Sequence, residues 1–138
     1  MKLHIIESPE ELIQGFESAL ATNEGIVIDH VSDNECEQVV ANNIIEKFPL
    51  ASVSSVLQKI VSKIRVGGTL NLSGIDANCF CKAYINDMTT KESMCEAINR
   101  CSSMLEVHDI IAALNSLGLE INYYRITGVN YEVSASRK

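Results

Sequence analysis

Polar side chains stand at the ends of two segments that are typical of buried β-strands. Asn42 and Asn43 close the strand predicted over residues 36 to 41, and Asp76 ends the strand predicted over residues 69 to 76. Open α/β sheets bind ligands at the carboxyl ends of their strands, so all three residues are candidates for a binding site. The asparagine amides can contact a bound cofactor, and the Asp76 carboxylate can bind a substrate amine or hydroxyl.

The same three residues also have a structural interpretation. Paired asparagines commonly end a strand and turn the chain, and we favour this role for Asn42 and Asn43. An aspartate that precedes a helix commonly caps its first turn, and the helix expected from Ala77 gives Asp76 that use. The sequence leaves both interpretations open.

The cysteines and histidines do not form a pattern that predicts metal binding or nucleophilic catalysis. Structural zinc sites normally use two close cysteine pairs with CxxC-type spacing, whereas Cys79 and Cys81 form a CxC followed by two isolated cysteines. The three histidines are scattered, and no Ser/His/Asp or Cys/His arrangement is apparent. We therefore assign no catalytic residue and no metal site, and we expect reduced thiols in a cytoplasmic protein.

Composition limits the class of protein and of partner. The chain has 138 residues with 46% hydrophobic and 21% charged residues, which suits a single domain over residues 1 to 138. No segment approaches the roughly 18 consecutive apolar residues of a membrane span, so no membrane is expected. A formal net charge of -7 disfavours direct binding to nucleic acid, because such binding needs clustered Lys and Arg.

Helical periodicity is strongest between residues 53 and 64. The apolar residues of that segment follow the i, i+3, i+4, i+7 spacing of one helix face, namely Val53, Val56, Leu57, Ile60, Val61 and Ile64. Two helical pieces, separated near residues 86 to 90, are predicted over 77 to 100, and another helix over 107 to 117. Ser8-Pro9 with an acid three residues after the cap predicts a further helix from Ser8 through Leu20.

Strand patterns occur between these helices and at the end of the chain. The sequence predicts strands over 3 to 6, 25 to 31, 36 to 41, 69 to 76, 121 to 127 and 131 to 136. The last two strands form a hairpin around Gly128. Alternation of strands and helices predicts an α/β fold with a mainly parallel mixed sheet, helices on its faces and an antiparallel hairpin at the end.

Two segments resemble the later core of class I S-adenosylmethionine-dependent methyltransferases. Residues 38 to 49, QVVANNIIEKFP, look like the fourth strand of that family and the leucine-glutamate-histidine-phenylalanine turn after it, with Lys47 where histidine is common. Residues 56 to 70 are similar to the next helix, the arginine-x-leucine-x-proline-glycine-glycine loop and the fifth strand, with Val66 in place of proline. The resemblance implies a Rossmann-like sheet with S-adenosylmethionine bound at the strand ends.

The end of the chain continues the resemblance. Leu114 to Leu119 matches the family's leucine-x-x-x-glycine-leucine helix end, and Ala135 to Arg137 matches the alanine-x-arginine that finishes its hairpin. The resemblance thus covers about residues 35 to 137. The order and spacing of these motifs carry the resemblance.

The first part of the chain departs from the family. Members hold the cofactor on a glycine-rich loop after the first strand and bind its ribose through an acid that ends the second strand. Here Glu7-Ser8-Pro9 follows the first strand, and Asp29, at the end of a predicted strand, stands in for the acid at a displaced position. We therefore expect weak or absent cofactor binding by the isolated chain.

Two functions follow from this departure. The first is an active methyltransferase, in which Asp29, Asn42 and Asn43 hold S-adenosylmethionine in an unusual site and Asp76 binds the substrate. The second is a degenerate, non-catalytic module on the same fold, with a second copy of the chain or another protein as its partner. The missing loop favours the second.

Overall fold

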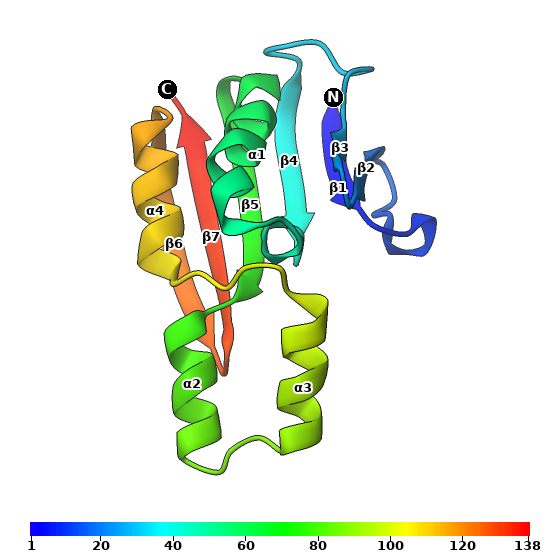
Figure 1. The fold of residues 1–138 in the computed structure, drawn as a ribbon. Helices are drawn as coiled ribbons and strands as arrows, with labels where there is room; N and C mark the ends of the chain where they lie inside the picture. Colours follow the sequence, from blue (N-terminus) through cyan, green and yellow to red (C-terminus); the bar gives the residue numbers. More distant parts are fainter.

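A computed structural model describes all residues from 1 to 138 and contains one seven-stranded sheet with four helices (Figure 1). The strands are β1 (Lys2–Ile6), β2 (Glu17–Thr22), β3 (Gly25–Val27), β4 (Cys36–Asn42), β5 (Ile64–Ile75), β6 (Leu119–Thr127) and β7 (Asn130–Arg137). The helices are α1 (Leu50–Lys63), α2 (Ala77–Ile85), α3 (Lys91–Arg100) and α4 (Val107–Ser116). Two 3-10 turns lie at Pro9–Glu11 and Ile45–Lys47.

The strand order is β3-β2-β1-β4-β5-β7-β6, which places the first strand of the chain in the middle of the sheet. β2, β1, β4 and β5 run parallel to one another, whereas β3, β7 and β6 join through antiparallel pairings. The α/β class and the closing β6–β7 hairpin are confirmed. The sheet is more mixed than we predicted, because three of its six pairings are antiparallel.

The helix predicted from Ser8 is wrong. The chain forms only the 3-10 turn at Pro9–Glu11, passes through Gly15 with φ +86°, and then enters β2. Ala19 and Ala21 are buried while Leu20 between them is 41% exposed, which is the alternation of a strand. Pairing of β2 with β1 therefore overrides the helical spacing of the apolar residues.

Two strand boundaries also differ from the prediction. β3 ends at Val27, so the strand expected to reach Val31 is short, and β5 begins at Ile64 rather than at Thr69. The pair Gly67-Gly68, which the resemblance places in a loop between helix and strand, lies inside β5. A Cβ on Gly68 would sit 2.8 Å from the carbonyl oxygen of Cys36, so this glycine permits the close approach of β4 and β5 at an irregular register.

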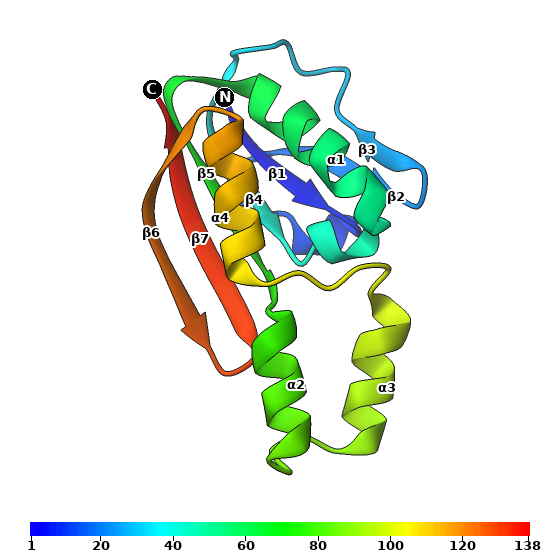
Figure 2. The ribbon, with the colours of Figure 1, turned by 60° about the vertical axis from the view of Figure 1, so that its left-hand side comes forward.

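Helices α1 and α4 lie on the same face of the sheet, and α2 and α3 extend beyond the carboxyl ends of the parallel strands (Figures 1 and 2). Along β5, Leu70 and Leu72 belong to the core, whereas Asn71 and Ser73 alternate with them and are only partly buried. This alternation is typical of a sheet with one face packed and the other face open to solvent. The two helices that cover the sheet, α1 and α4, thus pack against one of its faces.

The core is continuous between that face and α1 and α4. Val53, Val56, Leu57, Ile60 and Ile64 are all buried, as their spacing predicted, and they join one cluster with residues of α4 and of the sheet. None of the helices has the length and apolar composition that crossing a membrane requires. Because its buried side chains anchor α1 to the sheet, this helix also holds in place the turn at Ile45–Lys47 that connects it to β4. The candidate site lies at that turn.

Candidate functional site

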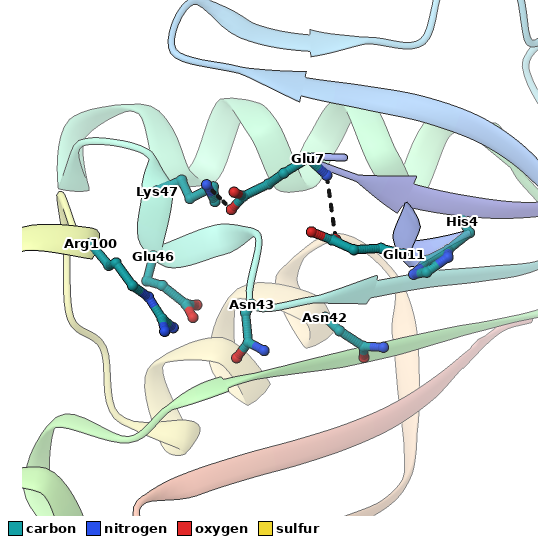
Figure 3. Close-up of a pocket in the computed structure, with 8 residues that line it drawn as sticks. All are labelled: His4, Glu7, Glu11, Asn42, Asn43, Glu46, Lys47 and Arg100. Carbon is teal, nitrogen blue, oxygen red and sulfur yellow. Dashed lines mark hydrogen bonds and ion pairs between the residues drawn. The ribbon is translucent and has the colours of Figure 1, made fainter. Parts of the chain in front are cut away.

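A cavity of about 600 Å³ opens at the carboxyl ends of β1 and β4 (Figure 3). It lies where the chain order in the sheet reverses, which is the usual ligand position in open α/β folds. Its wall comes from β1, the β1–β2 crossover, the end of β4 with the turn after it, and the end of α3. The lining residues are His4, Glu7, Glu11, Asn42, Asn43, Glu46, Lys47 and Arg100.

Asn42 and Asn43 line this cavity and also turn the chain. The Asn42 side-chain oxygen accepts a hydrogen bond from the Ser73 hydroxyl at 2.9 Å, which joins the ends of β4 and β5. Asn43 has φ +55°, a left-handed conformation that asparagine tolerates well, and its N–H donates to the Ser73 carbonyl at 2.8 Å. The structural and the binding interpretation of these two residues are therefore compatible.

Side chains of the protein itself bind the groups of Glu7, the residue that follows β1. Glu7 forms an ion pair with Lys47, and its N–H donates to the Glu11 carboxylate at 3.5 Å. Burial lowers the pKa of Lys47, and the nearby charge of Arg100 lowers it further. The Glu7–Lys47 pair thus links the first strand end to the turn after β4, beside the cavity.

Glu46 is the residue of the site that our sequence reasoning missed. It lies in the turn Ile45–Lys47, is only 6% exposed, and neither of its carboxylate oxygens has a hydrogen-bond partner. Burial raises the pKa of this carboxyl, although its own backbone and the charge of Arg100 partly oppose the shift. The signal for it was its match to the glutamate of the leucine-glutamate-histidine-phenylalanine turn, but a buried and an exposed glutamate look the same in a sequence.

Gly74 and Tyr131 leave room for the Glu46 carboxyl. A Cβ on Gly74 would lie 2.6 Å from a Glu46 carboxylate oxygen and 2.9 Å from the Tyr131 hydroxyl, both far inside normal contact. Burial raises the pKa of Tyr131, and the charges of Glu46 and Asp76 add to the shift. Glycine is therefore needed at position 74 for space. The Tyr131 hydroxyl of β7 and the Glu46 carboxyl of the turn after β4 both lie next to it.

His4 also lines the cavity, but its ring serves the crossover. The ring Nδ1 accepts a hydrogen bond from the Ile13 N–H at 3.3 Å, and the ring packs edge-on against Phe16 with centroids 6.4 Å apart. Burial lowers the pKa of His4, with a smaller opposing effect of Glu11. The imidazole therefore stays neutral near pH 7 and holds the loop between β1 and β2 against the sheet.

Asp76 takes the capping role. One carboxylate oxygen accepts from the Cys79 N–H at 2.9 Å and the other from the Val107 N–H at 2.8 Å, so a single side chain caps α2 and also holds the first residue of α4. Asp76 is 2% exposed and does not line the cavity. The structure thus does not bring it together with Asn42 and Asn43.

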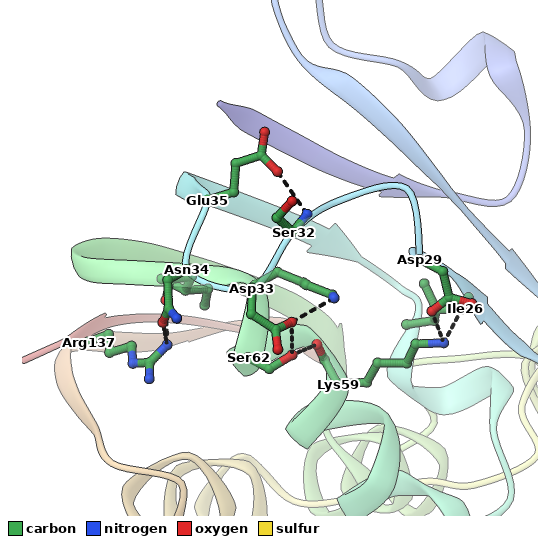
Figure 4. A network of polar contacts seen from close by, with 11 residues as sticks. Ile26, Asp29, Ser32, Asp33, Asn34, Glu35, Lys59, Ser62 and Arg137 are labelled. Carbon is green, nitrogen blue, oxygen red and sulfur yellow. Dashed lines mark hydrogen bonds and ion pairs between the residues drawn. The ribbon is translucent and has the colours of Figure 1, made fainter.

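Asp29 lies away from the cavity as well. It follows β3, which runs antiparallel to β2, and this places it towards the amino ends of the parallel strands. Its side chain is 86% exposed and pairs with Lys59 of α1 at 3.3 Å (Figure 4). The ribose-binding role stays a prediction that this position does not support.

The loop before β4 is tied down by a polar network (Figure 4). Arg137 at the end of β7 donates to the Ile64 carbonyl and to the Asn34 side-chain oxygen, each at 2.6 Å. Lys63 pairs with Asp33 at 2.7 Å in the same loop. The arginine that ends the hairpin therefore connects the last strand to the loop that precedes β4.

Truncation of Arg137 tests this connection. We expect Arg137→Ala to lower the free energy of unfolding by about 1 to 2 kcal/mol, because the two hydrogen bonds that the guanidinium donates are lost. Urea denaturation measures the change. Arg125→Ala, which removes only an exposed pair with Glu132, is the control and should have little effect. Equal effects of the two substitutions would contradict the role given to Arg137.

A second cavity of about 590 Å³ lies between the β2–β3 turn and the first half of α1. It combines the acid Glu24 with apolar side chains that include Ile26 and Phe48. No group of three or more His, Cys, Asp or Glu side chains is placed to hold a metal ion, and all five cysteines are free thiols.

Solved structures share this architecture. A methyltransferase from Archaeoglobus fulgidus that depends on S-adenosylmethionine superimposes with a TM-score of 0.64 at 9% identity, over 98% of this chain and 75% of the other. One from Thermotoga maritima gives 0.66 at 12% identity, over 100% and 73%. The chain has the class I methyltransferase fold. Magnesium protoporphyrin IX methyltransferase from Synechocystis, with bound S-adenosylhomocysteine, gives 0.56 at 15% identity over 76% of this chain but only 46% of its own.

The similarity of this methyltransferase-like chain extends further than its sequence motifs indicated. The motifs began near residue 35, whereas the superpositions on the Archaeoglobus and Thermotoga proteins include nearly all of the chain. No family model matches the sequence, and neither does any curated protein. The chain spans about three quarters of those two methyltransferases and less than half of the Synechocystis one.

Proposed function

We propose that this methyltransferase-like chain is a degenerate binding module that does not transfer methyl groups by itself. The observation that carries the proposal is the lining of the strand-end cavity, in which all eight residues are polar or charged. S-adenosylmethionine needs an apolar slot for its adenine, together with an acid and close backbone donors. The residues of this cavity do not fit that cofactor.

The β1–β2 crossover supports the same conclusion. No α-helix follows β1, so no helix N-terminus points N–H groups at the cavity, and Pro9 has no N–H to offer. The Glu7 N–H already donates to Glu11, and the Glu7 carboxylate is paired with Lys47. A cofactor with a carboxylate of its own would meet Glu7, Glu11 and Glu46 in this space.

An active methyltransferase is the second candidate, and the second cavity favours it. Glu24 follows the end of β2, and Ile26 and Phe48 supply apolar surface, which together are the groups that an adenosine requires. If the cofactor binds there, Glu24→Gln should weaken binding strongly, whereas Asp29→Asn should not. The degenerate module, by contrast, would bind a protein partner, either a second copy of the chain or another protein.

Titration calorimetry of the folded chain with S-adenosylmethionine distinguishes the two candidates. The degenerate module predicts no saturable heat at micromolar concentrations, and the enzyme predicts a dissociation constant in the micromolar range, equivalent to about -8 kcal/mol. Circular dichroism of the same sample establishes that the protein tested is folded.

A further inference from the structure

The Glu46 carboxyl has two acceptor oxygens that nothing in the protein fills, although buried polar groups are normally hydrogen-bonded. Figure 3 shows it directed into the space between Arg100 and Asn43. We propose that the strand-end cavity binds a small aliphatic amine as its ammonium ion, and that Glu46 is the anchor. This inference rests on the proposed function, because it names a ligand for the cavity that S-adenosylmethionine does not fit.

Charge in the cavity favours a cation. Its lining has three glutamates against Lys47 and Arg100, and His4 is held neutral, so the formal charge is 2 minus 3, or -1. Glu7 is neutralised by Lys47, and Glu11 accepts the Glu7 N–H. Arg100 makes no ion pair within 4.0 Å of any carboxylate, so it influences Glu46 only from a distance. Glu46 is therefore the one carboxylate of the lining that is buried with neither an ion pair nor a hydrogen bond.

An ammonium group matches the unused acceptors. It carries three N–H donors, and beside the cavity lie the two buried Glu46 oxygens, which have no partner, and the amide oxygen of Asn43. A buried carboxylate gains most from a cation that contacts it directly, because its loss of hydration is otherwise uncompensated. A divalent metal would need several oxygen ligands around it, and no cluster of three such side chains is present.

The surroundings of Glu46 preserve this arrangement. The Ser103 hydroxyl is also buried without a partner, and it lies with Glu46 and Tyr131 around one small internal space. The Ser102 and Ser103 N–H groups donate to the Glu46 carbonyl at 2.7 and 3.1 Å, which fixes the backbone of the turn. Because Gly74 has no side chain, the carboxyl keeps its position, and a methyl group there would displace it.

Titration with n-propylamine at pH 8, followed by the carboxyl ¹³C shift of Glu46 and by calorimetry, tests the proposal. We expect saturable binding with a dissociation constant of about 0.1 to 10 mM, as befits a ligand of four heavy atoms. Glu46→Gln should weaken it at least about 30-fold, because the amide removes the charge of a buried pair. Gly74→Ala should weaken it too, by moving the carboxyl. Glu10→Gln, an exposed change in the crossover outside the cavity, should leave it unchanged.

Three results would overturn the inference. They are no saturable shift of the Glu46 carboxyl in the folded wild-type protein, equal affinity in Glu46→Gln, and the same shift with Mg²⁺ but none with the amine. If Glu46→Gln does not fold, the inference is tested by the carboxyl ¹³C shift of Glu46 in the wild-type protein and by the amine affinity of Gly74→Ala. Micromolar binding of S-adenosylmethionine would instead overturn the proposed function, and a failure of amine binding alone leaves that function in place.

Discussion

Asp76→Ala should lower the free energy of unfolding by about 2 to 4 kcal/mol. Its carboxylate accepts from the N–H groups of Cys79 and Val107 at the starts of two helices, and it is 2% exposed. Alanine would leave both donors without their partner, one of them fully buried, and would also remove the cap of α2. Urea denaturation followed by circular dichroism measures the loss.

Two comparisons make this expectation specific. Asp29→Ala changes an aspartate whose side chain is 86% exposed and pairs only with Lys59 at the surface, and it should change stability by less than about 1 kcal/mol. Asp76→Asn keeps one acceptor oxygen and should recover part of the loss. If Asp76→Ala unfolds at the same urea concentration as the wild type, the carboxylate does not hold the two helices.

The same carboxylate gives stability a dependence on pH. Burial acts to raise the pKa of Asp76, but the hydrogen bonds from Cys79 and Val107 outweigh burial, so the pKa is lowered. The folded state therefore binds this proton less readily than the unfolded chain. The contribution is complete above the unfolded pKa of about 3.9 and is lost as the pH falls through the lower folded pKa. Asp76→Ala should lack this acid-dependent part.

Leu57→Ala should destabilise the protein by about 2 to 5 kcal/mol. Leu57 lies on α1, is 0% exposed and belongs to the core between that helix and the sheet, so its truncation removes apolar contact and leaves a cavity. Thermal and urea denaturation both report the change. Because α1 follows directly on the turn that contains Glu46, loosening of the helix should also disturb the cavity.

Leu50→Ala is the matched control, because Leu50 begins the same helix and is 65% exposed. We expect a change of less than about 0.5 kcal/mol there. A loss at Leu57 that is no greater than the loss at Leu50 would mean that α1 is peripheral, and the position of the β4 turn would need another explanation.

Regular periodicity explains which elements could be predicted. The apolar spacing from Val53 to Ile64 is long and uninterrupted, and α1 follows it closely. The break near residues 86 to 90 and the end of the helix predicted over 107 to 117, just before Gly118, are also confirmed, because glycine and polar turn residues act through local backbone geometry. The β6–β7 hairpin turns around Gly128 with φ +63° for the same reason.

The elements before residue 35 were predicted less well, because their structure depends on partners far along the chain. The segment from Ser8 to Leu20 has a good helix start and apolar residues at helical spacing. Its second half nevertheless becomes β2, since β1 provides a strand to pair with and Gly15 separates the two halves. Local preference decides only where tertiary contacts do not compete.

The candidate site was predicted in part for a similar reason. Topology alone placed Asn42 and Asn43 at the carboxyl edge of the sheet, and both line the cavity. Glu46 was missed although it matches the glutamate of the leucine-glutamate-histidine-phenylalanine turn, because its burial against β5 and β7 depends on tertiary contacts. Asp29 was assigned to a strand end without knowledge that β3 runs in the opposite direction.

The direct test of the degenerate-module account is calorimetric titration of the folded chain with S-adenosylmethionine and with S-adenosylhomocysteine. The account predicts no saturable binding of either compound up to about 1 mM, or about -4 kcal/mol, in the wild-type protein and in the Glu24→Gln and Asp29→Asn variants alike. A micromolar dissociation constant in the wild type that Glu24→Gln abolishes would contradict it, and would show that the chain retains a cofactor site of a methyltransferase.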